Sequence, residues 1–291
     1  MKRIVLFIFT NLAILLVLSA VAELTGLDAW LAREGESVTA LLIYAAIFGF
    51  SGALISLALS KWLAKRAMGV RVIETPANAA EQWLLETVRV LSQRAGIAMP
   101  EIGVFESAQP NAFATGPRRD QALVAVSSGL FSSMQRDEIE AVIGHEITHV
   151  ANGDMVTLTL IQGVVNTFVI FLSRIVGNIV DGALTRDENG RGPAYLVTVL
   201  ITELVLGALA TMIVMWFSRQ REFRADAGGA SLAGRDRMIA ALRRLQQAHD
   251  QPLPAQLHAL GISGGEGAGW QRLFLSHPPL AERIAALQSQ A

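Results

Sequence analysis

The chain has 291 residues, of which 52% are hydrophobic and 17% are charged, and its mean hydropathy is +0.42. Soluble domains carry about 25% charged residues, so this composition excludes an ordinary soluble enzyme and indicates an integral membrane protein. The 24 basic and 25 acidic residues leave a net charge of −1, which argues against nucleic-acid binding. No cysteine is present, which excludes disulfides, cysteine-ligated metal sites and thiol nucleophiles.

Four apolar segments are long enough to cross a bilayer, which takes about 20 helical residues. They cover residues 4–22, 38–59, 155–171 or slightly beyond, and 196–217. The first resembles a secretion signal, but its apolar stretch is longer than the roughly 15 residues of such signals, so we expect a retained anchor. The sequence therefore predicts an α-helical integral membrane protein with four transmembrane helices.

Basic residues gather at one end of the first, second and fourth predicted membrane segments. By the positive-inside rule, this places both termini and residues 61–154 in the cytoplasm. The residues concerned are Lys2, Arg3, Lys61, Lys65, Arg66, Arg71, Arg219, Arg221 and Arg224.

The membrane segments divide the chain into four parts. Residues 1–60 hold two N-terminal transmembrane helices, 61–154 a first water-facing block, 155–217 a transmembrane hairpin, and 218–291 a second water-facing block. Helical spacing and β-branched residues predict the elements within the blocks. These are helices at 79–95, 235–249 and 280–287, strands at 102–105 and 122–126, and a glycine-rich loop at 261–269.

The strongest motif is His145-Glu146-Ile147-Thr148-His149, which lies on a predicted amphipathic helix. Two histidines at i and i+4 stand on one helix face, where both can reach a zinc ion at about 2.0–2.1 Å. Glu146, one step round the helix, can contact the metal-bound water, as a hydrolytic zinc site requires. Gly144 costs about 1 kcal/mol inside a helix, which indicates that another backbone approaches closely there.

A catalytic zinc usually has three protein ligands and one open position. Glu222 and Asp226 are the most suggestive carboxylates, because they lie at i and i+4 on a predicted helix, where one could bind zinc and the other orient a ligand imidazole. Three further histidines are also available: His249, His258 and His277. Alternatively, both carboxylates pair with neighbouring arginines on a juxtamembrane face, and the spacing alone does not choose between the two. These arginines are Arg219, Arg221 and Arg224.

The segment from His145 to Asp154, followed by an apolar hairpin and then Glu222-Phe223-Arg224-Ala225-Asp226, resembles the HtpX family of membrane zinc metalloproteases. The stretch from Asn111 to Gly116 and Ser276-His277-Pro278-Pro279 ahead of Arg283 extend the resemblance. It covers essentially the whole chain, and the motifs occur in family order. The related CAAX-prenyl proteases share the ligand pattern but are larger, with more membrane helices, so they fit less well.

The resemblance implies a mainly α, α+β zincin-like (gluzincin) protease domain in the cytoplasm, at the inner membrane, with one Zn²⁺ per chain. It implies His145, His149 and Glu222 as ligands and Glu146 as the catalytic base. Supporting roles fall to residues around the ligands, namely Asp226, Arg283, Asn152 and Asp154.

The resemblance also places His277 near the oxyanion of the reaction. The alternative for His277 is a turn residue before Pro278-Pro279, whereas His249 and His258 match no family motif and are expected at the surface.

The stretch Asn111-Ala112-Phe113-Ala114-Thr115 is expected to flank the substrate cleft, where an extended substrate could pair as an added strand. The alternative is an ordinary turn.

The spacing of the motifs also indicates where the site lies relative to the membrane. His149 comes six residues before Met155 and Glu222 five after Phe217, so helical connections would put the zinc on the order of 10 Å from the membrane. We therefore expect membrane-protein substrates, cut in cytoplasmic loops or juxtamembrane ends, and the resemblance implies quality control of damaged membrane proteins. An intramembrane site is disfavoured because charged residues, which are expensive at bilayer depth, bracket the motif. They are Asp137, Glu138, Glu140 and Asp154.

Arg174 and Glu203 fall at similar depths on the third and fourth predicted membrane helices, which predicts an ion pair that clasps the two helices.

The alternative to a protease is a non-enzymatic metal-binding membrane scaffold or transporter. A transporter would be expected to show broken spans or inverted repeats, and the sequence shows neither.

Overall fold

The computed structural model describes residues 37–184, 192–248 and 269–289. The predicted first membrane segment, residues 4–22, lies outside the described residues, as do His249 and His258. The described chain separates into two compact units. One comprises the described residues up to Ile55 together with Thr159–Met212, and the other comprises Ser56–Leu158 together with the chain from Ile213 onward.

Three helices of the described chain are long and apolar enough to cross a membrane: α3 (Val38–Met68), α7 (Asp154–Leu184) and α8 (Pro193–Ala233). They correspond to the second, third and fourth predicted membrane segments. Each runs beyond its apolar segment into polar sequence. The 41-residue α8 continues well past Phe217, so that Glu222 and Asp226 lie on the same helix as the fourth span.

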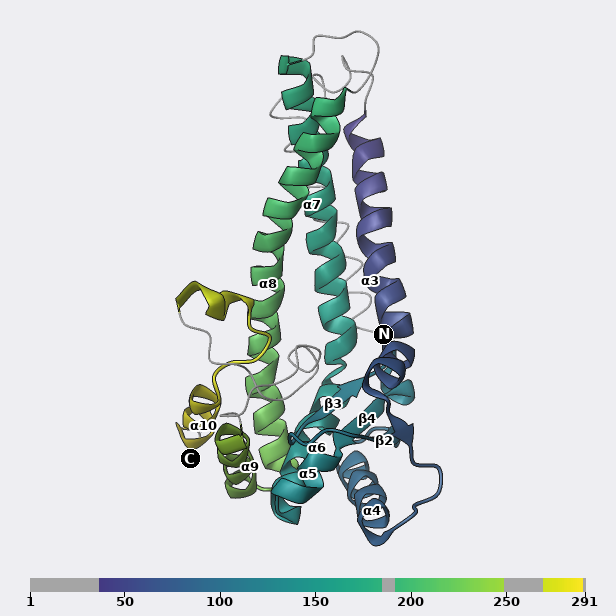
Figure 1. The fold of residues 1–291 in the computed structure, drawn as a ribbon, viewed down its shortest axis with the longest axis vertical. Helices are drawn as coiled ribbons and strands as arrows, with labels where there is room; N and C mark the ends of the chain where they lie inside the picture. Colours follow the sequence, from purple (N-terminus) through teal and green to yellow (C-terminus); the bar gives the residue numbers. More distant parts are fainter. Residues whose placement is uncertain (1–36, 185–191, 249–268, 290–291) are drawn as a thin grey trace. The chain divides into compact units, whose positions relative to one another are not determined.

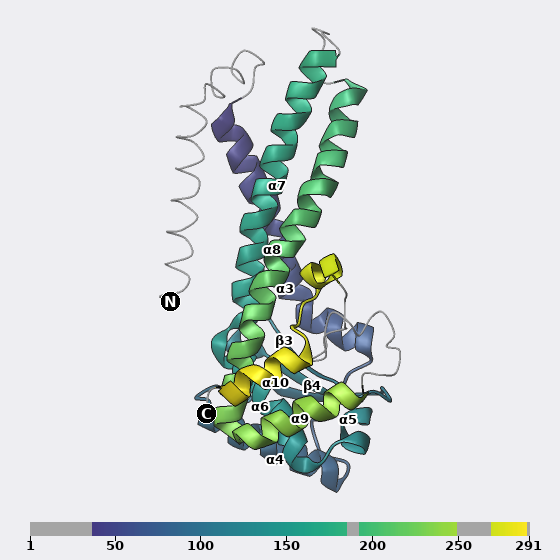
Figure 2. The same cartoon turned by 90° about the vertical axis from the view of Figure 1, so that its left-hand side faces the viewer.

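Within the first unit, α7 lies between α3 and α8 (Figures 1 and 2). Leu42 and Ala45 of α3 pack with Phe171 of α7 in a small apolar cluster. Many apolar side chains of α8 are instead exposed, as expected of a surface that faces lipid. Examples are Leu196, Leu200 and Leu204, which are 69%, 66% and 73% exposed.

Polar side chains also join the three helices of the first unit. Arg174 Nη1 of α7 lies 3.1 Å from Glu203 Oε1 of α8, which confirms the predicted ion pair. The same guanidinium donates through Nη2 to the hydroxyl of Tyr44 on α3, at 3.1 Å. The predicted pairwise clasp therefore involves a third helix as well.

The second unit contains a four-stranded sheet in the order β1-β2-β4-β3. The strands are β1 (Arg71–Val72), β2 (Glu101–Phe105), β3 (Ala112–Thr115) and β4 (Leu123–Ser127). β2 and β4 are parallel, whereas β1 pairs antiparallel with β2 and β3 antiparallel with β4. The two strands predicted from β-branched residues, β2 and β4, form the centre of the sheet, and β3 lies at one edge.

Helices of the second unit cover the sheet and extend the core. They are α4 (Ala79–Arg94), α5 (Ser128–Ser133), α6 (Arg136–Asn152), α9 (Arg235–Ala248) and α10 (Leu280–Ser289), with short 3-10 turns η1 (Arg119–Gln121) and η3 (Gly269–Phe274). The predicted helix at 79–95 is confirmed: Asn78 caps its first turn and Gly96, with φ +65°, follows its end. The predicted helices at 235–249 and 280–287 correspond to α9 and α10.

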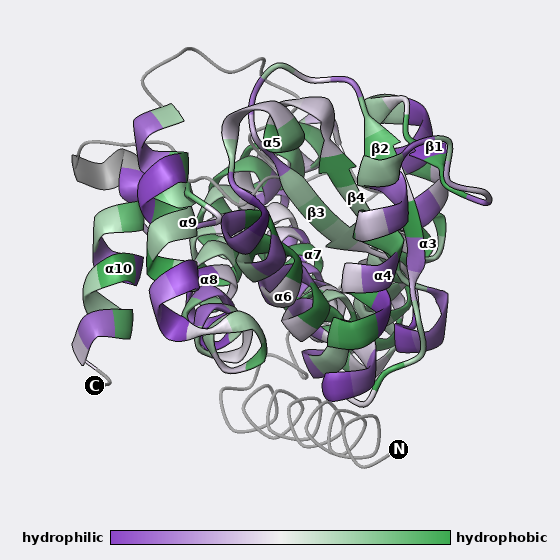
Figure 3. Cartoon of the chain, turned by 90° about the horizontal axis from the view of Figure 1, so that it is seen from below, coloured by the Kyte–Doolittle hydropathy of each residue, from purple (hydrophilic) through white to green (hydrophobic). Residues whose placement is uncertain are grey.

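α6 is the central helix of this unit and packs against α4, β3 and α9 (Figure 3). Ile139, Ile143 and Ile147 are buried in the core that these elements share. A capping box between Gln135 and Glu138 closes the start of α6. At its other end Gly153 has φ +65°, a conformation that glycine adopts without cost, and α7 begins at the next residue.

The predicted close approach at Gly144 is confirmed. A Cβ placed on Gly144 would lie 3.4 Å from the Cα of Gly229, and one on Gly229 would lie 2.9 Å from the backbone nitrogen of His145. Two glycines thus let the backbones of α6 and α8 nearly touch. This contact brings the helix that carries the two histidines against the helix that carries Glu222.

Candidate metal centre

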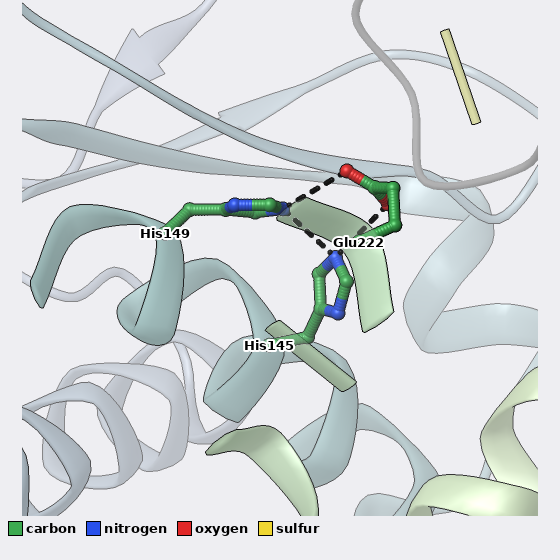
Figure 4. A group of neighbouring side chains, drawn as sticks. All are labelled: His145, His149 and Glu222. Atoms are coloured by element: carbon green, nitrogen blue, oxygen red, sulfur yellow. Dashed lines mark hydrogen bonds and ion pairs between the residues drawn. The ribbon is translucent and has the colours of Figure 1, made fainter. Parts of the chain in front are cut away.

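His145, His149 and Glu222 converge on one point, with their ligand atoms within 4.8 Å of one another (Figure 4). The Nε2 atoms of His145 and His149 lie 3.1 Å apart. Glu222 places Oε1 3.3 Å from Nε2 of His149 and Oε2 3.5 Å from Nε2 of His145. Two imidazole nitrogens and a carboxylate oxygen therefore surround a space that could hold a metal ion.

A carboxylate contacts each imidazole at Nδ1, the ring nitrogen that faces away from the proposed metal position. Asp226 Oδ1 lies 2.9 Å from Nδ1 of His145, and Asp154 Oδ2 lies 2.8 Å from Nδ1 of His149. Because an ionised carboxylate can only accept hydrogen bonds, each Nδ1 carries the proton in a neutral ring. The lone pair of each Nε2 then faces the common point, as is usual for histidine ligands of metals.

Arg283 completes this support from α10. Its side chain is fully buried and grips Asp226 with two hydrogen bonds, Nη2 to Oδ1 at 2.6 Å and Nε to Oδ2 at 2.8 Å. Nη1 also lies 3.4 Å from Glu222 Oε2. Burial alone would raise the pKa of Asp226, but Arg283 outweighs it and lowers that pKa to about 2. Asp226 is therefore an anion near neutral pH.

The electrostatics of the centre favour a cation. Burial disfavours a charged imidazole, yet Glu222 and Asp154 outweigh that cost and raise the pKa of His149 to about 10. Despite burial, the neighbouring histidines hold the pKa of Glu222 well below its ordinary value. A pocket that stabilises a positive charge in this way also stabilises a metal cation.

One buried oxygen of the centre lacks a hydrogen bond among the described residues. Glu222 Oε2 lies 2.7 Å from Nδ1 of His277, but the pair does not have hydrogen-bond geometry, and both atoms are buried without a hydrogen-bond partner among the described residues. A buried carboxylate oxygen that accepts no hydrogen bond costs free energy unless a ligand satisfies it. The donor set and this oxygen together fit a bound divalent metal.

The structure places Glu146 and His277 at the same centre. Glu146 is 3% exposed on α6, and its charge helps to raise the pKa of both His149 and Arg283. His277, in the connection between η3 and α10, lies beside the carboxylate of Glu222. Residues from three segments that are distant in the sequence therefore meet around one point.

The remaining predicted positions lie along α6 and its neighbours. Asn152 is the last residue of α6, half-buried, one turn beyond His149. The residues from Ala112 to Thr115 form strand β3 rather than a turn, and Asn111 precedes it, buried. Because β3 packs against α6, this sheet edge lies next to the helix that carries the histidines.

Two arginines of α8 have roles that the sequence did not reveal. Arg221 donates through Nη1 to the backbone carbonyl of Asp154 at 3.0 Å, and Arg219 donates to backbone carbonyls of the connection that leads to His277. The ion pairs described for Glu222 and Asp226 are with histidines and Arg283 rather than with Arg219 or Arg221. Backbone acceptors are common to every residue type, so no sequence pattern could have pointed to these contacts.

Comparison with known proteins gives the family. Residues 78–291 match peptidase family M48. A protease HtpX homolog from Thiobacillus denitrificans is 64% identical over 289 residues, covering 99% of both chains, and proteases HtpX from Thioalkalivibrio sulfidiphilus and Nitrosococcus oceani are each 60% identical over 292 residues, again with 99% coverage. The crystal structure of S. mikatae Ste24p has the same fold, with a TM-score of 0.64 at 21% identity over 97% of this chain and 67% of that one.

These relatives are named as proteases, which favours an enzyme over a non-enzymatic scaffold or transporter. The apolar helices are consistent with a membrane protein, and the buried cluster of two histidines and a glutamate is consistent with a metal-dependent protease like these relatives. The chain is a membrane metalloprotease that belongs to peptidase family M48, among the HtpX proteases.

Proposed function

We propose that this chain is a zinc-dependent endopeptidase of the inner membrane that cleaves cytoplasmic or juxtamembrane segments of misfolded or damaged membrane proteins. The observation that carries the proposal is the convergence of His145, His149 and Glu222, with each imidazole held by its own carboxylate. Two histidines and one glutamate form a donor set that fits a catalytic zinc site, which usually has three protein ligands.

The residues of the chain divide the work of peptide hydrolysis. His145, His149 and Glu222 would hold the zinc, which would supply Lewis acidity toward the scissile carbonyl and toward water. Glu146 accepts a proton from the attacking water and passes it to the nitrogen of the leaving amine. Asp226, fixed by Arg283, and Asp154 keep the two imidazoles in the tautomer that binds metal.

His277 is proposed to stabilise the negative charge that develops on the scissile carbonyl oxygen. Its ring lies beside Glu222, and the side chain is 13% exposed, so it is partly open to an incoming substrate. A hydrogen-bond donor in this role is worth about 3 kcal/mol of transition-state stabilisation in comparable hydrolases.

The edge strand β3 is proposed to bind the substrate. It pairs with β4 on one side, and no strand of the described chain pairs with its other side. An extended peptide that adds to this edge would form backbone hydrogen bonds largely independent of its sequence. Such binding suits a protease whose substrates share an unfolded state rather than a motif.

We propose that the protease domain faces the cytoplasm. The basic residues that flank the apolar helices support this orientation. In this division residues 1–60 and 155–217 are the membrane part, with four transmembrane helices in total, and residues 61–154 and 218–291 form the two halves of the cytoplasmic domain.

Zinc-dependent cleavage of a membrane protein tests the proposal directly. The purified full-length chain, in detergent and then in liposomes, is incubated with a destabilised membrane protein that carries a cytoplasmic loop. We expect cleavage within that loop, its loss on chelation and its return on adding zinc. The Glu146→Gln variant, handled identically, is the inactive control, and cleavage that persists in the metal-free protein would contradict the proposal.

A further inference from the structure

We propose that Arg219 is a positioning residue for the reaction, because it holds the backbone that leads to His277. The inference rests on the proposed role of His277. It concerns the His277 loop, residues 275–279, which connects η3 to α10. Arg219 lies on α8, one turn before Glu222, and touches none of the three proposed ligands in the contacts described for it.

A single nitrogen of Arg219 serves three backbone carbonyls. Nη1 lies 3.2 Å from the oxygen of Arg272, 3.3 Å from that of Leu273 and 2.8 Å from that of Leu275. Nη1 carries two hydrogens, so at least one of them is shared between acceptors, and the shortest contact is to Leu275.

These carbonyls belong to the last turn of η3 and the residue that follows it. Carbonyl groups at the end of a helical turn carry partial negative charge and mostly lack backbone partners, although that of Arg272 also accepts from the backbone nitrogen of Leu275 at 3.4 Å. A buried or half-buried cation there satisfies several acceptors at once. Leu275 is two residues before His277, so the contact with Arg219 fixes the entry into the His277 loop.

The exit from the loop is fixed as well, and again on α8. Pro278 and Pro279 restrict the backbone. The backbone nitrogen of Arg283, in the first turn of α10, donates to the carbonyl of Pro279 at 3.2 Å. The side chain of Arg283 then binds Asp226 of α8. α8 therefore anchors the chain on both sides of His277, through Arg219 before it and through Asp226 after it.

Glu222 lies between these two anchor points on the same helix, three residues after Arg219 and four before Asp226. The imidazole of His277, held between the anchors, comes to 2.7 Å from the carboxylate of Glu222. Loss of the Arg219 contacts would free one end of the loop without touching the metal ligands. A catalytic group that moves by about 1 Å can lose up to 100-fold in rate.

A double-mutant cycle with zinc-loaded, full-length protein tests this inference. Arg219→Gln, His277→Ala and the double variant are compared by kcat and KM on a fluorogenic peptide and by zinc content. We expect Arg219→Gln to lower kcat by about 10- to 100-fold with zinc content unchanged. In the His277→Ala background, the same change should have less than a twofold effect, because the residue that Arg219 positions is gone.

Two further variants control the experiment. Arg219→Lys keeps a cation with three hydrogen-bond donors and should recover part of the kcat lost in Arg219→Gln. If the Arg219→Gln variant does not fold, Arg219→Lys takes its place in the double-mutant cycle. Arg243→Gln, an exposed arginine on α9, should behave as the wild type.

Equal losses from Arg219→Gln with and without His277, or no loss at all, would overturn the positioning role while zinc-dependent cleavage stands. Full activity of His277→Ala would instead overturn the proposed role of His277 and this inference with it. A wild-type protein that cleaves without metal would contradict the proposed function itself, so the three failures are distinguishable.

Discussion

The carboxylate of Asp154 lies 2.8 Å from Nδ1 of His149, although the two residues belong to different helices. α6 ends at Asn152, and Asp154 is the first residue of α7. The left-handed Gly153 between them turns the chain so that the next helix begins with its carboxylate against the imidazole. The junction of two helices thus also orients a proposed metal ligand.

Replacement of Asp154 by Asn should weaken metal binding. The amide can still lie near Nδ1 but no longer supplies the charge that raises the basicity of the ring, and such changes typically cost about 10- to 100-fold in metal affinity. Zinc affinity measured by competition with a chromophoric chelator checks this. Asp236→Asn, an exposed aspartate on α9, is the matched control, and equal affinities for the two variants would rule out the role of Asp154.

Glu146→Gln should separate chemistry from metal binding. The variant keeps all three proposed ligands and should hold one zinc per chain, but it should lose about 100- to 10,000-fold in peptide cleavage because the general base is gone. His149→Ala should lose the metal as well as the activity. Near-normal cleavage by Glu146→Gln would show that another group takes the proton.

Gly229→Ala should destabilise the domain and disturb the centre. Its new Cβ would lie 2.9 Å from the backbone nitrogen of His145, so α6 and α8 would have to separate, at a cost of about 1–3 kcal/mol. The expected result is a lower unfolding temperature and a lower zinc affinity. Gly207→Ala, on the same helix with no other part of the chain within 4 Å of its new Cβ, should lower neither. A Gly229→Ala variant with unchanged stability would refute the close helix contact.

Arg174 and Glu203 should show energetic coupling in the first unit. Removal of one partner leaves the other charge unpaired among apolar helices, so each single alanine variant should be destabilised. The double variant should lose less than the sum, with a coupling free energy of about 0.5–3 kcal/mol. Unfolding in mixed detergent micelles provides the measurement, and additive losses would show that the pair is not a clasp.

The ion pair between Arg71 and Glu81 should make stability depend on pH. The side chain of Arg71 and the backbone nitrogen of Ala77 bond the Glu81 carboxylate and hold its pKa below the ordinary 4.5. Because the folded-state pKa is lowered, the stabilisation is fully present above pH 4.5 and is lost as the pH falls through the lowered value.

Comparison of Glu81→Gln with the wild type tests whether the stabilisation by this ion pair is lost as the pH falls. The variant should unfold a few degrees lower between about pH 6 and 7, and the difference should shrink at about pH 4 and below. Glu86→Gln, which removes an exposed carboxylate from the same helix, is the control. A difference that grows on acidification would contradict the assignment.

Periodic patterns predicted most of the helices and both central strands, because a helix or a strand with one buried face repeats its apolar residues at a fixed spacing. The helix boundaries were harder to predict. The apolar segment ends at Phe217, whereas α8 continues to Ala233. No proline lies between them, and neither the glycines Gly228 and Gly229 nor the change from apolar to polar residues ends the helix. Hydropathy detects the environment of a helix rather than its length.

The proposed metal ligands were predictable for a different reason. His145 and His149 are separated by one helical turn, so their shared face follows from helical geometry alone. Glu222 comes from a distant segment, and residue spacing left it undecided until family resemblance entered. The contacts of Arg219 and Arg221 were not foreseen because they depend on how distant backbones meet, as the glycine contact between α6 and α8 illustrates.

The proposed ligands and their supports are spread over the chain, from His145 on α6 to Glu222 and Asp226 on α8 and finally Arg283 on α10. During synthesis, both apolar helices of the hairpin therefore precede the proposed third ligand or contain it, and Asp226 gains its partner Arg283 only once α10 has been made. A nascent or truncated chain lacks a complete centre. The order of the sequence thereby couples completion of the proposed centre to synthesis of the chain through α10.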